Sequence, residues 1–394
     1  MVRLPPRLRP LFPYLKPAYV AGTRLVAPVT QRLGRGALPG SVAHTMDDAA
    51  AGGGRCVTAR PAEVLERPRM LGRPAGLPLS DPSDGEHVGR VAVLELPRGR
   101  VLGPHRAVIT GDGALVHEIS QYFGTCRPRE HPVFLNPRPA PAFDVAGRLG
   151  VLASRGDGNY YHFLFDVLPR LGVLAQSGLD PVDRWYVPAG TPFQRELLEL
   201  FGLDAIVDAT AHPHVRAETL VVPGPPAMTE QNPPWVVGFL RDRLLPRVDG
   251  GGPRRRLYVT RGSGANNRVV SNDAAVRGLL TARGFEAIDP GALTVREQVA
   301  AFAAAEVIVA PHGAALANLA FASPGATVIE LFPAGCLLPD YWRLACGVPG
   351  LRYRYLSAPG PRRPRAAAIV RDIDVDLAAL DDLLDEALAL TPGS

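Results

Sequence analysis

The stretch Val307-Ile308-Val309-Ala310-Pro311-His312-Gly313-Ala314 indicates the fold of the chain more clearly than any other part. Its four leading apolar residues predict a buried strand, and the following Pro-His-Gly sequence predicts a turn into a helix that begins near Ala314. A second apolar strand follows at residues 327–331. Strands that alternate with helices in this way predict a parallel sheet whose two faces are covered by helices.

The same alternation continues on both sides of this stretch. Thr294 followed by Glu297 is a capping-box sequence that predicts a helix start, and Thr191 before Pro192 is another start signal. We therefore expect an α/β protein with two Rossmann-like domains, which are joined by the proline-rich segment 223–234 and face a cleft. Ligands of such sheets bind at the carboxyl ends of the strands.

These patterns predict four regions along the chain. Residues 1–90 are rich in proline, glycine and arginine, so we expect an irregular basic extension there. We expect a first α/β domain at residues 91–249 and a second at residues 250–365. Residues 366–394 contain apolar positions at helical spacing, which predicts a C-terminal helix that packs back on the body.

The composition excludes several classes of protein. The chain has 394 residues, of which 46% are hydrophobic and 21% are charged, so it is neither disordered nor collagenous. It has no run of the about 18–20 apolar residues that a membrane-spanning helix requires, and its start lacks the pattern of a signal peptide. Its four cysteines form no CxxC pair, which indicates neither a zinc site nor a disulfide framework. We therefore expect a cytoplasmic protein.

The basic residues are concentrated near the N-terminus. Seven of them, including the single lysine of the chain, Lys16, precede the first acidic residue, Asp47. Residues 1–40 could therefore contact the anionic inner face of a membrane, where each basic residue contributes about 1 kcal/mol. The alternative is a solvated tail. Nucleic acid is not an expected partner, because the rest of the chain has no basic excess.

The first candidate site lies in residues 158–171, of which residues 159–168 predict an apolar helix. Only His162, Asp166 and Arg170 interrupt this apolar stretch, at a spacing that places all three on one helix face. Burial of such groups is costly unless they pair or face a cleft. A histidine beside a carboxylate could act as a general base, because the carboxylate raises its proton affinity. The alternative is a His–Asp pair that only orients the helix.

The second candidate site follows the strand expected at residues 257–260. Arg261 stands at the carboxyl end of this strand, and Asn266-Asn267-Arg268 follows in a glycine-containing loop. Two guanidinium groups that converge at a strand end suit a diphosphate, because each planar group can hold two phosphate oxygens. The alternative is that these arginines are ordinary surface residues.

The third candidate site is the turn in the opening stretch. His312 and Gly313 precede a helix N-terminus, whose N–H groups favour an anion. Gly313 would let a phosphate approach the backbone, and His312 could add a donor. Glu330, at the end of the next strand, could accept hydrogen bonds from ribose hydroxyls. The alternative is a tight turn that serves packing alone.

Taken together, the three segments resemble glycosyltransferase family 61, the DUF563 proteins, which include bacterial capsular polysaccharide biosynthesis proteins. The resemblance covers about residues 90–360. It rests on Asn159-Tyr160-Tyr161-His162 with the sequence from Asp166 to Leu171, on Tyr258-Val259-Thr260-Arg261, and on His312-Gly313-Ala314 with Asn318 and Glu330-Leu331. One departure is Asn272-Asp273, where the family often has Asn-Glu.

The resemblance implies an inverting, GT-B-like glycosyltransferase of polysaccharide biosynthesis. It implies that Asp166, directly or through His162, takes the proton of the acceptor hydroxyl. The implied donor site consists of Arg261, Asn267, Arg268, His312, Gly313, Ala314, Asn318 and Glu330. We expect a nucleotide-sugar donor, with UDP as the nucleotide on the resemblance alone, and a glycan or other hydroxyl acceptor. No metal and no other cofactor is expected.

Two other functions stay open on the sequence. Pyruvyl and phosphate-type transferases of exopolysaccharide pathways also use paired α/β domains and arginine clusters. A non-catalytic glycan-binding scaffold would fit if His162 and Asp166 only satisfied each other.

An acidic run near the C-terminus has two interpretations. Asp372, Asp374 and Asp376 have the Asp-x-Asp spacing that holds a divalent metal in some sugar transferases. The run directly precedes the C-terminal helix, however, where aspartate is a good N-cap. The sequence therefore favours a helix cap.

Overall fold

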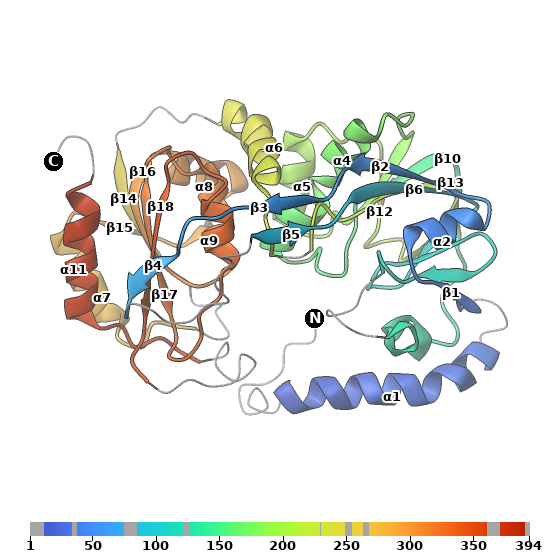
Figure 1. Cartoon of the computed structure of the whole chain (residues 1–394), viewed down its shortest axis with the longest axis horizontal. Coiled ribbons are helices and arrows are strands. Elements are labelled where there is room, and N and C mark those ends of the chain that lie inside the picture. The colour runs from blue at the N-terminus through green and yellow to red at the C-terminus, as the bar shows by residue number, and fades with distance from the viewer. Residues whose placement is uncertain are drawn as a thin grey trace. The chain divides into compact units, whose positions relative to one another are not determined.

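The computed structural model of the chain contains two compact units (Figure 1). It describes residues 12–33, 38–74, 85–120, 127–228, 230–248, 254–262, 268–360 and 371–390. Unit 1 is built mainly from Val64–His87 and Glu230–Ser394, and unit 2 from Tyr14–Glu63 and Val88–Thr229. Each unit has its own sheet and its own hydrophobic core, which confirms the α/β class expected from the sequence.

The sheet of unit 1 is parallel throughout and has the order β15-β14-β16-β17-β18-β4. Its strands are β4 (Leu71–Arg73), β14 (Arg255–Val259), β15 (Glu286–Ile288), β16 (Ala305–Pro311), β17 (Thr327–Phe332) and β18 (Arg352–Ser357). The helices that connect β14 to β18 are α7 (Asp273–Ala282), α8 (Val295–Ala303), η7 (Ala314–Phe321) and α9 (Asp340–Ala345). The direction in which strands are added reverses between β14 and β16. Ligands of parallel α/β sheets bind at such a switch point, outside the carboxyl ends of the strands.

Helices cover both faces of this sheet. α7 and α11 (Leu377–Leu388) lie together on one face, and α8 and α9 lie on the other (Figure 1). Alternate residues of the central strands contribute to the two sides, because successive side chains of a strand point to opposite faces. Val309 and Leu331 pack in the core under α7 and α11. Glu330, next to Leu331, therefore points to the opposite side of the sheet.

The sheet of unit 2 has a parallel half and an antiparallel half. Its parallel strands are β10 (Phe143–Val151), β11 (Arg184–Val187), β12 (Ile206–Asp208) and β13 (His214–Pro223), in the order β13-β10-β11-β12. β13 pairs in antiparallel fashion with β6 (Val91–Pro97) and β7 (Arg100–Leu102), and the sheet continues through β8 (Ala107–Ile109), β9 (Ala114–Val116) and β1 (Ser41–Ala43). β2 (Arg55–Arg60) pairs with β6.

The remaining elements are mostly short. They are α1 (Phe12–Leu33), α2 (Met46–Ala51), β3 (Glu63–Leu65), β5 (Glu86–Val88), η2 (Pro128–Glu130), η3 (Pro132–Leu135), α3 (Tyr160–His162), η4 (Phe163–Val167), α4 (Arg170–Ser177), α5 (Pro192–Leu200), α6 (Pro234–Leu244), η5 (Leu245–Arg247) and η6 (Pro290–Ala292). Both expected capping boxes are present, since Thr191 caps α5 and Thr294 caps α8. Within the described ranges, no helix is both long enough and apolar enough to cross a membrane.

The first 90 residues are more regular than the expected irregular extension. Their described part contains α1, α2 and the strands β1 to β5. Two physical reasons explain the difference. The strands are short and pair with strands far away in the sequence, such as β1 with β9 and β4 with β18, so no local periodicity indicates them. Helix α1 contains Pro17 and Pro28, which argue against a helix in a reading of local propensity.

Candidate functional site

The carboxyl ends of β14 and β16 bring the second and third candidate sites together. The two strands are neighbours, with Arg261 following β14 and His312 following β16. Nη1 of Arg261 donates a hydrogen bond of 2.6 Å to the backbone carbonyl of His312. Gly313 makes this approach possible, because a Cβ at Gly313 would lie 2.1 Å from Nη1 of Arg261. The site therefore lies at the switch point of the unit 1 sheet.

Arg261 and Arg268 are two desolvated positive charges in this region. Burial, together with the nearby charge of Arg268, lowers the pKa of Arg261 to about 10. Burial also lowers the pKa of Arg268, whose φ of 56° lies in the left-handed region that is uncommon for a side-chain-bearing residue. The Nε atom of each guanidinium is buried and has no hydrogen-bond partner among the described residues. Two such groups are suited to bind an anion with several negatively charged oxygens.

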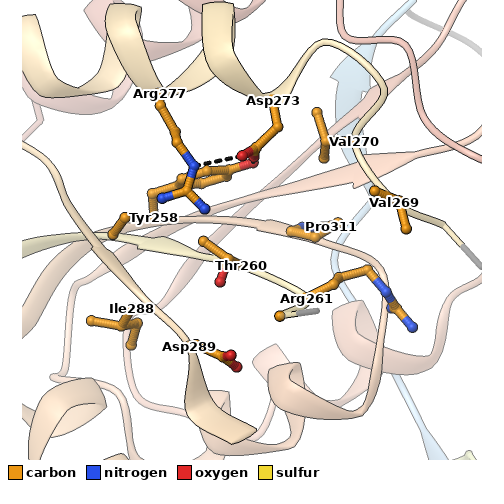
Figure 2. A pocket seen from close by; sticks show the side chains of 12 residues that line it. Tyr258, Thr260, Arg261, Val269, Val270, Asp273, Arg277, Ile288, Asp289 and Pro311 are labelled. Atoms are coloured by element: carbon orange, nitrogen blue, oxygen red, sulfur yellow. Dashed lines mark hydrogen bonds and ion pairs between the residues drawn. The ribbon is translucent and has the colours of Figure 1, made fainter. Parts of the chain in front are cut away.

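A pocket of 440 Å³ lies beside Arg261 in unit 1. Figure 2 shows Ile288 and Asp289 on one side of Thr260, and Val269 and Val270 on the other. The pocket is lined by Tyr258, Thr260, Arg261, Gly262, Val269, Val270, Asp273, Arg277, Ala287, Ile288, Asp289 and Pro311. Its volume is typical of sites for small molecules, and its lining combines apolar surface with a few polar groups.

One wall of this pocket is held by Asp273 at the start of α7. The hydroxyl of Tyr258 donates to Oδ1 of Asp273 at 2.6 Å, and Nε of Arg277 lies 2.5 Å from Oδ2 (Figure 2). Asp289 is fixed on the other side, where its Oδ1 accepts from the backbone N–H of Gly291 at 3.0 Å. Asp273, Arg277 and Asp289 are not among the site residues that the sequence motifs indicate. Asp289 directly follows a strand, and this position could have identified it.

A buried network holds the ring of His312. Nδ1 of His312 lies 2.5 Å from Oε1 of Glu330, and the hydroxyl of Tyr353 donates to the other carboxyl oxygen. The ring stacks on Phe332 with 5.1 Å between the ring centroids. Glu330 is fully buried, and this burial raises the pKa of its carboxyl well above the usual range. Both carboxyl oxygens are thus used inside the protein, so this geometry has Glu330 orienting His312 and not facing a ribose.

Only some of the other residues of the expected donor site lie near Arg261. Ala314 is the first residue of η7, a 3₁₀ helix, at the turn beside Arg261. Asn318 is fully buried, and its Nδ2 donates to Oε1 of Gln298 at 2.9 Å, which ties η7 to α8. Asn267 lies outside the described residues.

The first candidate site lies in unit 2, beyond the carboxyl end of β10. The sequence predicts one helix over residues 159–168, but the structure has a single α-turn, α3, followed by the π-helical turn η4. The backbone N–H of Leu168 donates to the carbonyl of Phe163 at 3.1 Å, a π-helical bond that spans five residues. Pro169 has no N–H to continue the α-helical pattern. Single π-turns of this kind are frequent at functional sites.

His162 and Asp166 face each other across this turn. Nδ1 of His162 lies 2.8 Å from Oδ2 of Asp166, and their side chains are 24% and 14% exposed. Arg170 shares their helix face but is buried, with Nε donating to the carbonyl of Asp166 and Nη1 to that of Pro223. Its burial lowers the pKa of the guanidinium to about 10. The three residues thus divide into a partly exposed His–Asp pair and an internal arginine that holds the backbone.

The loop before α3 supports the ring of His162. A Cβ at Gly156 would lie 2.8 Å from Cγ of His162, so the ring packs directly against this glycine. Oδ2 of Asp157 accepts from Nε of Arg106 at 2.8 Å, in an ion pair of which both side chains are buried. Nε2 of Gln194 donates to the carbonyl of Asp157 at 2.8 Å. No sequence motif links Arg106 or Gln194 to this site, because each is far from His162 along the chain.

The acidic run near the C-terminus caps a helix, as the sequence favours. Oδ1 of Asp376 accepts from the backbone N–H groups of Ala378 and Ala379 at 3.1 Å. Asp372 accepts from the backbone of Val269, and Asp374 lies within hydrogen-bond distance of Ser271. In the part of the chain that the structure describes, no three His, Cys, Asp or Glu side chains are grouped so that they could hold a metal ion.

Two desolvated arginines at the switch point of a parallel sheet are typical of an α/β protein that binds a phosphorylated ligand. The model of the family Glycosyltransferase 61 matches residues 160–329 of the chain. This match confirms the recognition of glycosyltransferase family 61 from the sequence motifs, and the family indicates glycosyltransferase activity. His162, Asp166, Arg261 and Gly313 all lie within the matched region. A search of curated proteins found no match to the chain.

Proposed function

We propose that the protein is an inverting glycosyltransferase that moves a sugar from a nucleotide-sugar to a hydroxyl group of a glycan or similar acceptor in polysaccharide biosynthesis. The observation that carries this proposal is the convergence of Arg261 and Arg268 beside the His312-Gly313 turn. The departing nucleoside diphosphate gains negative charge as the bond to the sugar breaks. Fixed positive charges in a desolvated site stabilise that change.

In this proposal unit 1 binds the donor. The diphosphate contacts Arg261, Arg268 and the backbone at Gly313, while the base and ribose occupy the 440 Å³ pocket. Val269 and Ile288 offer apolar contact to a base, and the carboxylate of Asp289 can accept hydrogen bonds from the base or ribose. UDP is the nucleotide that we propose. The two guanidiniums supply charge at the diphosphate, so we expect EDTA to leave the transfer rate unchanged.

Unit 2 supplies the base for the acceptor. An ionised Asp166 can only accept, so it holds the proton of His162 on Nδ1 and leaves Nε2 as the basic atom. His162 then takes the proton from the acceptor hydroxyl while the acceptor oxygen bonds to the anomeric carbon. The bond from this carbon to the diphosphate oxygen breaks in the same step, and its electron pair leaves with the nucleoside diphosphate. A base of this kind contributes about 10²–10⁴-fold to the rate.

A thermal-shift screen of the full chain tests the proposal. UDP, GDP, CMP and phosphoenolpyruvate are compared, and we expect UDP to stabilise the protein by about 2.7 kcal/mol at 100 times its Kd. Arg261→Ala should remove this response, whereas Arg254→Ala, at an exposed position of the same unit, should retain it. Stabilisation by phosphoenolpyruvate alone would indicate a pyruvyl-type transferase. No response to any nucleotide would contradict the donor site.

A further inference from the structure

Helix α1 packs on unit 2 through small and polar residues. Thr23 and Ala27 are 1% and 0% exposed, and Ala27 belongs to an apolar cluster with residues of β7, β8, β9 and η3. Nε2 of Gln31 donates to the carbonyl of Pro39 at 2.7 Å. Among the side chains that the structure describes, the inner face of α1 therefore carries no large aliphatic residue.

The outer face of α1 carries the large apolar residues instead. Thirteen large hydrophobic side chains are exposed among the described residues, and five of them lie on this helix. They are Tyr19 (42% exposed), Leu25 (78%), Val26 (41%), Val29 (59%) and Leu33 (60%). Spacings of three, four and seven residues place them in one stripe along the helix. Single exposed apolar residues are ordinary, but a continuous stripe indicates a surface that is covered in function.

The charged residues of α1 are all basic, and one of them lies beside the stripe. Arg32 is exposed at spacings of three and seven residues from Val29 and Leu25, whereas the exposed Arg24 lies on another side of the helix. The chain contains no acidic residue before Asp47. A second copy of the same face would bring like charges together, which disfavours a dimer through α1. An anionic lipid surface has the opposite charge and a boundary region that accepts apolar side chains.

We propose that the outer face of α1 docks on the surface of an anionic lipid bilayer. Leu25, Val29 and Leu33 enter the boundary between headgroups and acyl chains, and Arg32 contacts lipid phosphates. Tyr19 suits this boundary, since its ring is apolar and its hydroxyl can stay in water. The proposal rests on α1 alone and does not depend on the chemistry of the transferase site.

Sedimentation of the full chain with vesicles tests this docking. Vesicles of phosphatidylcholine that contain about 30 mol% phosphatidylglycerol are compared with vesicles of phosphatidylcholine alone. This anionic fraction is of physiological order. The triple variant Leu25→Ser/Val29→Ser/Leu33→Ser should bind the anionic vesicles at least about tenfold more weakly, because the apolar contact is lost. Arg32→Gln should weaken binding about fivefold at low salt, and Arg24→Gln, which lies on another side of the helix, should weaken it less.

A matched control separates the stripe from exposed apolar residues in general. The double variant Val64→Ser/Met228→Ser removes side chains that are 53% and 72% exposed elsewhere, and it should bind as the wild type does. Circular dichroism should show the same thermal midpoint for all variants, since every altered side chain is exposed or partly exposed. Truncation of α1 is a poorer test, because it would uncover the cluster around Ala27.

Three results would overturn the proposal. The first is wild-type binding that is absent, or equal on the two kinds of vesicle. The second is binding that the triple variant retains. The third is a wild-type dimer in sedimentation velocity that the triple variant loses, because a second copy would then be the occupant of this face.

Discussion

Nη1 of Arg261 donates a 2.6 Å hydrogen bond to the backbone carbonyl of His312, and this bond joins the ends of β14 and β16. It holds the guanidinium over Gly313, at the switch point of the sheet. The Nε atom is buried without a partner among the described residues. A hydrogen-bond donor that is fixed in place and has no partner binds an anion favourably, because the free-energy cost of removing it from water was already incurred when the protein folded.

Replacement of Arg261 by alanine should weaken nucleotide binding. We expect Arg261→Ala to reduce the affinity for UDP by about 1.5–3 kcal/mol, the usual contribution of hydrogen bonds to charged groups. Isothermal titration calorimetry of the variant and of Arg254→Ala provides the measurement and its control. Unchanged affinity in Arg261→Ala would place the diphosphate elsewhere.

Gly313 offers a sharper test of the same site. A methyl group at this position would lie 2.1 Å from Nη1 of Arg261, the mobile end of a long side chain, so the guanidinium should move while the fold persists. Gly313→Ala should therefore weaken UDP binding by about as much as Arg261→Ala. In the double variant the two losses should not add, because both act on one guanidinium.

The control for Gly313 is Gly278 in α7, where an added Cβ meets nothing within 4 Å. Gly278→Ala should leave UDP binding unchanged and slightly stabilise the helix. Full additivity of Gly313→Ala and Arg261→Ala would show that the glycine acts on the ligand or the fold by another route.

The sequence was most informative in unit 1, because its strands and helices are long enough to show their own periodicity. α8 begins at the capping box that the sequence predicts, and the strands that precede Arg261 and His312 were both expected. Parallel topology then places these two residues at one edge of the sheet. The proximity of Arg261 and His312 was therefore predictable from strand order.

Contacts between distant residues could not be predicted in this way. Arg106 reaches Asp157 across 51 positions of the chain, and no local pattern links them. The burial of Glu330 depends on Tyr353, which lies on the next strand. The π-turn at Phe163–Val167 has no sequence signal beyond Pro169. Local propensity describes elements, whereas these features arise from packing between elements.

The buried carboxyl of Glu330 should affect the pH dependence of stability. It is surrounded by His312, Tyr353, Arg268 and Asp340, and its burial raises its pKa well above 4.5. Between pH 4.5 and this raised pKa, the folded state keeps a proton that the unfolded state has lost. The free energy of unfolding therefore falls as pH rises, by at most about 1.4 kcal/mol per pH unit.

Glu330→Gln cannot ionise, so its stability should fall less steeply with pH than that of the wild type. Urea denaturation of both proteins at about pH 5.5, 7 and 8.5 gives the comparison, because carboxyl groups with a raised pKa titrate in about this range. The difference should increase in favour of the variant toward high pH. If the free energies of unfolding of the two proteins changed in parallel with pH, Glu330 would already be ionised in the folded state at about pH 5.5. This pH is roughly one unit above the ordinary pKa of a glutamate carboxyl group.

The ring of His162 should be sensitive to the glycine on which it packs. A Cβ at Gly156 would lie 2.8 Å from Cγ and 3.1 Å from Cβ of His162, so the ring must rotate about χ1 or the backbone must shift. Gly156→Ala should therefore lower the transfer rate by about 10-fold or more, the effect of a misplaced catalytic group. Gly158→Ala is the matched control, since nothing lies within 4 Å of its added Cβ. Equal rates for the two variants would remove His162 from the reaction.

The roles of His162 and Asp166 can be separated by their variants. If Nε2 of His162 takes the proton and Asp166 fixes the ring, His162→Gln and Asp166→Asn should each lower transfer by about 10²–10⁴-fold. UDP affinity should stay within about twofold of the wild type, because neither residue belongs to the donor site in our proposal.

The double variant decides between the two possible bases. If the two residues act as one unit, either substitution alone removes the whole rate enhancement of the pair. The double variant His162→Gln/Asp166→Asn should therefore be about as slow as either single variant. If Asp166 were the base itself, His162→Gln would keep most of the activity. A loss of UDP binding in Asp166→Asn would contradict both assignments, because Asp166 would then belong to the donor site. The 2.8 Å contact between Nδ1 and Oδ2 favours the first outcome, since it directs the carboxylate toward the imidazole.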